Sequence, residues 1–129
     1  MKAVSIAVLA GASMFIAGSA FAASLSAEIA NARTHANNAA NAATIDAAHM
    51  HMHHALNCLV GPKGEGYDAS QMNPCASAGD GAIPDQTDAA KKAKLESAKA
   101  ALMKGLGQSD LKAAQASAAL AVTDISSAS

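Results

Sequence analysis

The residues with the most evident chemistry lie in one short segment near the middle of the chain. Four of the five histidines occur there, interleaved with two methionines, in the order His49, Met50, His51, Met52, His53 and His54. Imidazole nitrogens and thioether sulfurs together are ligands for borderline and soft transition metals. The segment therefore predicts a metal site, for copper before any other ion, with nickel or zinc as the next candidates.

Helical spacing divides these ligands between faces. On a helix, His49 and His53 stand one turn apart. Asp46 precedes His49 by three residues, so its carboxylate is expected to ligate the metal or to orient an imidazole. By the same count His51 points to the far, exposed side. We therefore expect an inner site around His49 and His53, at the edge of the apolar face.

An outer site, open to solvent, is the second possibility. Met50 and His54 stand one turn apart between the two faces and would share it with His51. The fifth histidine, His35, lies 14 residues before His49, about 21 Å along a straight helix. It joins the same metal only if the chain folds sharply between them.

Several other activities are excluded by motif or charge. The residues between His49 and His53 do not include the glutamate of a zinc-peptidase helix, so the general base of that reaction is missing. A formal net charge of −1 argues against a nucleic-acid partner. We expect a protein that is not an enzyme. The plainer alternative is a solvated histidine surface, with Met50 and Met52 filling the core.

The N-terminal 22 residues are typical of a secretory signal. Lys2 precedes an apolar stretch that ends in the small-residue site Ala20-Phe21-Ala22. We expect removal of residues 1–22, a periplasmic or secreted location, and no membrane attachment afterwards. In such an oxidising compartment Cys58 and Cys75 are expected to form a disulfide, with a pair of thiolate metal ligands as the alternative.

The elements that position these groups are expected to be helices. Alanine, the best helix former, accounts for 36 of the 129 residues, and residues 24–59 contain neither Pro nor Gly. Leu25 and Ile29 fall on the opposite side of a straight helix from Ile45 and its apolar partners. The chain therefore bends or breaks near Asn38, and Thr44 is a candidate cap for a restart.

The second half of the chain predicts a long loop and two more helices. Gly and Pro concentrate between residues 60 and 86, and the expected disulfide ties this loop down. A helix capped by Asp85 or Thr87 then runs to about Lys104, and Ser109 caps the last helix. The expected fold is all-α: one domain at 23–129, a small antiparallel bundle of three or four helices with a disulfide-stapled Gly/Pro loop.

An export signal, alanine-rich helices and scattered histidines together resemble the small histidine-rich metal-binding proteins of bacterial periplasms. His35, His49 and His53 carry the resemblance, which covers residues 24–59. It implies a four-helix bundle that stores, scavenges or delivers a transition metal. The loop with Cys58 and Cys75 departs from that pattern, as do the C-terminal helices, which lack histidine.

Two other functions remain open from the sequence. A helical bundle can hold b-type haem for electron transfer, with His49 or His53 and Met103 as axial ligands. Covalent haem attachment is excluded because no C-x-x-C-H motif is present. Alternatively, the loop at 60–86 presents a surface to another periplasmic protein and no metal is bound.

Overall fold

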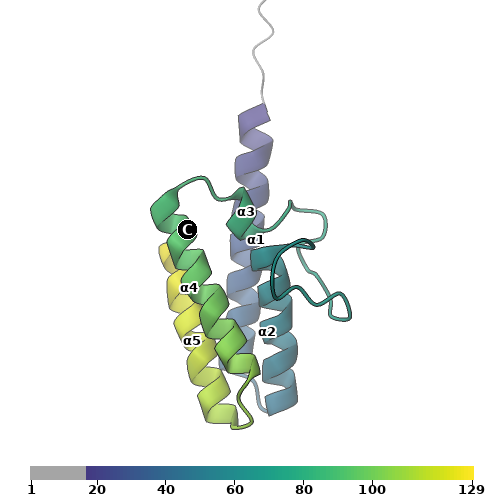
Figure 1. Ribbon diagram of the computed structural model, residues 1–129, viewed down its shortest axis with the longest axis vertical. Coiled ribbons are helices and arrows are strands. Elements are labelled where there is room, and N and C mark those ends of the chain that lie inside the picture. Colours follow the sequence, from purple (N-terminus) through teal and green to yellow (C-terminus); the bar gives the residue numbers. More distant parts are fainter. Residues whose placement is uncertain (1–16) are drawn as a thin grey trace, which may run out of the picture.

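The regular secondary structure of the described residues is entirely helical. The computed structural model describes residues 17–129, which contain no β-strand. The helices are α1 (Ala17–Ala40), α2 (Ile45–Val60), α3 (Ala82–Asp85), α4 (Ala89–Leu106) and α5 (Leu111–Ser127) (Figure 1). Residues 1–16, which hold most of the expected signal at 1–22, lie outside the described residues.

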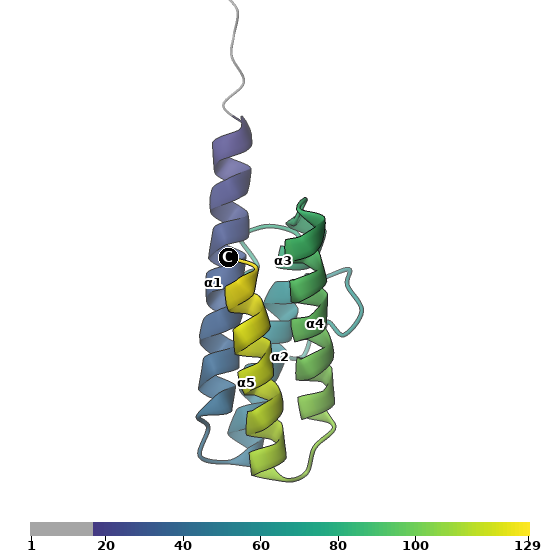
Figure 2. The ribbon, with the colours of Figure 1, turned by 90° about the vertical axis from the view of Figure 1, so that its left-hand side faces the viewer.

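The four long helices lie side by side as a bundle (Figure 2). α1 packs against α2 and α5, and α4 packs against α5 and α2. The short connections at 41–44 and 107–110 turn each helix back on the one before it, so that α1–α2 and α4–α5 form two antiparallel hairpins. Within residues 17–129 no helix combines the length and apolarity that a membrane crossing requires.

Polar side chains cap the first turns of α2, α4 and α5. The Thr44 side chain accepts a hydrogen bond from the Ala47 amide, 3.2 Å away, so α2 restarts where the sequence predicts. The caps of α4 and α5 are Asp88 and Asp110, each accepting from amides in the following turn, rather than the predicted Asp85 or Thr87 and Ser109. A carboxylate accepts hydrogen bonds from these free amides, and its negative charge interacts favourably with the positive end of the helix dipole.

The core is built mainly from small residues. Its largest fully buried apolar side chains are Met52, Leu56, Leu59, Leu95, Leu102 and Ile125, and most of the others are alanines. Small side chains allow the helices to approach closely: a Cβ added at Gly105 would lie 2.7 Å from the Met52 sulfur. Met52 therefore packs towards the second hairpin.

The segment between α2 and α3 is fastened at both ends. Gly61 and Gly81 have φ values of +66° and +118°, which favour glycine. The backbone at Gly61 lies directly against the backbone at Asp80 and Gly81, so the two ends of the segment are in contact. The Cys58–Cys75 disulfide is present, with a sulfur–sulfur distance of 2.05 Å, and no free cysteine remains in the described residues. The predicted loop at 60–86 thus includes the short helix α3 near its end.

Asn57 anchors the same segment from within. Its side chain is fully buried, and its amide nitrogen donates to the carbonyl oxygens of Asp68, Gln71 and Met72. Its side-chain oxygen accepts from the Asp68 amide at 2.9 Å. One side chain therefore satisfies several backbone groups that have no helix or strand to pair with.

Candidate metal centre

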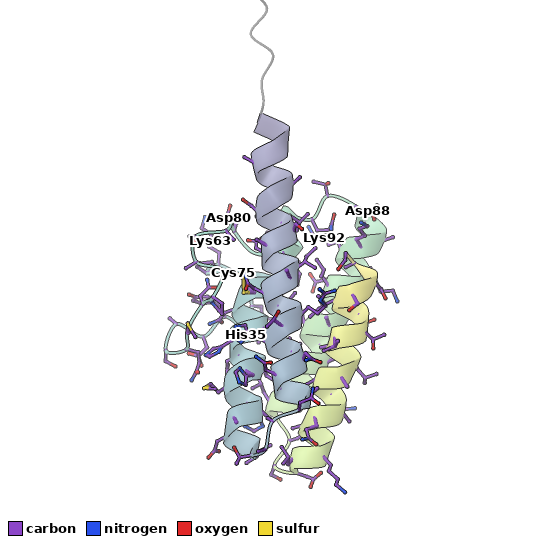
Figure 3. All side chains as sticks on the ribbon, turned by 180° about the vertical axis from the view of Figure 1, so that it is seen from behind. His35, Lys63, Cys75, Asp80, Asp88 and Lys92 are labelled. Carbon is purple, nitrogen blue, oxygen red and sulfur yellow. A yellow bond between two sulfur atoms is a disulfide. The ribbon has the colours of Figure 1, made fainter. Side chains whose placement is uncertain are left out.

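Three histidines from two helices meet across the contact between α1 and α2, which we call the α1–α2 seam. His35 comes from α1, and His51 and His54 come from α2. The break at 41–44 makes this possible: His35 precedes it and His51 follows it by similar distances, so the hairpin brings them level. Figure 3 shows His35 on α1, with Cys75 nearer the N-terminal end of that helix.

The three imidazoles are close enough to share one ion. One ligand nitrogen from each lies within 4.8 Å of the other two. The Nδ1 atoms of His35 and His51 are 3.3 Å apart, and the ring centroids of His35 and His54 are 5.1 Å apart. Such separations suit three nitrogens around a metal with bonds of about 2 Å.

Burial of the cluster favours the neutral, ligating form of its imidazoles. His54 is buried, whereas His35 and His51 are half-buried. Burial lowers the pKa of His35 below 6.5, and the nearby His54 and His51 lower it further. Burial also lowers the pKa of His54, with His51 and His53 adding to the effect. Protonation is thus disfavoured because the proton would bring charge into a partly dehydrated cluster of like groups.

One ring nitrogen of the cluster is both shielded from solvent and without a hydrogen-bond partner. The Nδ1 atom of His54 is shielded from solvent and makes no hydrogen bond in the described structure. Buried polar atoms are usually satisfied, and exceptions call for an explanation such as an ion. The donor set, three nitrogens from neutral imidazoles, fits zinc, copper and nickel.

The structure separates the predicted ligands into two groups. His51 was expected on the exposed side, but it is half-buried and faces His35, because α1 covers a second face of α2. His35 was expected to join only after a sharp fold, and the connection at 41–44 provides that fold. The signal for it was already in the sequence, in the capping residue Thr44 and the reversed apolar face.

His49 and His53 lie outside the cluster. His53 Nδ1 is 3.6 Å from a carboxylate oxygen of Asp68, in the segment that Asn57 anchors. His49 is half-buried, and its Nε2 atom is shielded without a hydrogen-bond partner. Asp46, expected to support His49, is exposed in the first turn of α2.

The two methionines differ from each other as well. Met50 is 41% exposed, whereas Met52 is fully buried and its sulfur lies next to Gly105 of α4. Met52 therefore points to the core between the hairpins, as the plainer alternative predicts, whereas the same prediction is wrong for Met50. Of the predicted ligands, the structure brings together His51 and His54, with His35 as the third member.

Comparison of the chain with protein-family models, with curated proteins and with solved structures gives no match. The function is therefore argued from the geometry of the site.

Proposed function

We propose that this protein binds one divalent transition-metal ion, reversibly and without catalysing a reaction, through His35, His51 and His54. The observation that carries the proposal is the convergence of three imidazoles from two helices, with ligand nitrogens within 4.8 Å of one another. The shielded, unpartnered Nδ1 of His54 and the lowered pKa values of His35 and His54 support it.

Copper(II) is the ion we expect to bind most tightly, followed by zinc and nickel. For a given nitrogen site, affinity rises along the first-row metals to copper(II) and falls again at zinc. Copper(I), which prefers sulfur ligands, is less favoured because Met52 is directed to the core. The resemblance to histidine-rich periplasmic proteins, together with the disulfide, supports storage, scavenging or delivery of the ion in an oxidising compartment.

Calorimetric titration of the purified protein with Cu²⁺, Zn²⁺ and Ni²⁺ tests the proposal. We expect one ion per chain and an increase in melting temperature. A ligand present at 100 times its Kd and bound only by the folded state contributes about 2.7 kcal/mol. If none of the three ions binds more tightly than about 10 μM at pH 7.5, the proposal is wrong.

The same titration at lower pH tests whether imidazoles are the ligands. Protons compete for their nitrogens, so affinity should fall as the pH drops through and below 6.5, the ordinary pKa of histidine. The lowered pKa values of His35 and His54 should let binding persist to a lower pH than with exposed histidines. An affinity equal at pH 7.5 and pH 5 would assign the ion to other ligands.

A further inference from the structure

A buried acid lies on α1, two helical turns before His35. Glu28 is fully buried. One of its carboxylate oxygens, Oε1, accepts a hydrogen bond from the Gly81 amide at 2.9 Å. The other, Oε2, is shielded from solvent and has no hydrogen-bond partner. An ionised carboxylate in such a place is costly unless a positive group or several donors surround it.

The neighbours of Glu28 are acids. Asp85 of α3 is also buried, and its Oδ2 accepts from the Asp80 amide at 3.1 Å. A Cβ added at Gly79 would collide with the carboxylates of both Glu28 and Asp85, so the two groups lie under the same turn of the chain. Asp80 follows Gly79 on the segment that covers them (Figure 3).

Two carboxyl groups so close together cannot both be ionised without strong repulsion. Burial raises the pKa of Glu28 to about 7, against the opposing effect of the Gly81 amide, and the charge of Asp85 adds to the rise. Among the described residues, the charge of Asp80, again an acid, also raises the pKa of Glu28.

We propose that Glu28 and Asp85 share one proton and form a pH-sensitive latch, which fastens residues 79–81 and α3 to α1. In the protonated pair one carboxyl group donates to the other, while each group still accepts from a backbone amide of the segment above. When the proton leaves, two buried negative charges face each other and this end of the segment loosens. Asn57 and the Cys58–Cys75 disulfide hold the other end, so the opening is confined to the part of the segment that follows Cys75.

The direction of the pH effect follows from linkage. From the ordinary value of 4.5 up to about 7, the folded protein keeps a proton on Glu28 that the unfolded chain has lost. The contribution of this pair to stability therefore falls as the pH rises through that interval, and it is smallest above pH 7. The latch is closed in mild acid and open in mild alkali.

Replacing Glu28→Gln tests the latch, because glutamine keeps an oxygen for the Gly81 amide and can always donate to Asp85. The parent protein, with no metal added, should lose at least about 5 °C in melting temperature relative to Glu28→Gln between pH 5 and pH 8. Hydrogen exchange at the amides of Asp80 and Gly81 should accelerate over the same range in the parent and not in the variant. Glu96→Gln, an exposed site on α4, is the matched control and should follow the parent.

Two results would overturn the proposal. One is a Glu28→Gln protein whose melting temperature and amide exchange keep the pH dependence of the parent. The other is recovery of the parent's stability at pH 8 by added Ca²⁺, since a cation would then hold the pair together in place of a proton. If Glu28→Gln does not fold, Asp85→Asn replaces the other partner and carries the same expectations.

Discussion

The two faces of α2 carry the same residue type and offer different chemistry. His51 and His54 face α1, where His35 completes a group of three. His49 and His53 are not members of that group, and His53 Nδ1 lies 3.6 Å from a carboxylate oxygen of Asp68. Spacing within one helix is equally good for both pairs. The difference comes from what the rest of the chain places opposite each pair, and this is what decides whether an ion can be surrounded.

The largest expected effect concerns the segment that covers the His53 face. Replacing Cys58→Ala and Cys75→Ala together removes a cross-link between residues 17 positions apart. The free energy of unfolding should fall by about 3 kcal/mol on the chain-entropy account, as measured by urea denaturation. Metal affinity of the folded protein should change little, because α1 and its histidine are positioned by the connection at 41–44. A parallel loss of affinity would show that both faces depend on the disulfide.

Removing a histidine from each face compares them directly. His35→Ala should weaken Cu²⁺ or Zn²⁺ binding by about 100-fold or more, since the ion loses one of three protein ligands. His49→Ala is the matched control, a half-buried histidine outside the cluster, and should retain the parent affinity within about threefold. Both are measured by calorimetry at pH 7.5. Equal losses in the two variants would remove the distinction between the faces.

The smallest effect is expected for the pair formed by His53 and Asp68. Asp68→Asn removes the charge opposite His53 but keeps a side chain that can still bond to Ser70. The two atoms are 3.6 Å apart without a hydrogen bond between them, and both side chains are partly exposed. Such a pair contributes little, so the melting temperature should move by less than about 3 °C. Metal binding should not change. A clear drop in affinity would instead make Asp68 and His53 part of the site.

Much of the helical framework could be predicted from the sequence, because it depends on local signals. Thr44 begins α2 as expected, and the pairing of Cys58 with Cys75 follows from their number. The prediction that His51 points to the exposed side was wrong, and the reason is physical. The prediction depended on the large apolar residues of α2, whereas the buried residues of α1 are mostly alanines such as Ala32 and Ala36, which leave no visible stripe in the sequence.

Contacts between residues far apart in the sequence could not be predicted in the same way. The meeting of Glu28 with Asp85 depends on where the segment after Cys75 returns to α1, and nothing in the spacing of these acids indicates it. His35 is an intermediate case. The sequence predicts that it joins the other histidines only if the chain turns back between them, and the capping residue Thr44 indicates such a turn. Groups that meet through a hairpin are partly visible in sequence, and groups that meet through a loop are not.

The connection at 41–44 gives the histidine cluster a property that none of its members has alone. In an unfolded chain His51 and His54 remain neighbours, but His35 is separated from His51 by a flexible stretch of 16 positions. The hairpin replaces that stretch by a fixed separation, and so raises the effective concentration of the third imidazole at the other two. An ion held by all three would close a chelate ring through the turn. Any event that parts α1 from α2 would then release the ion without a competing ligand.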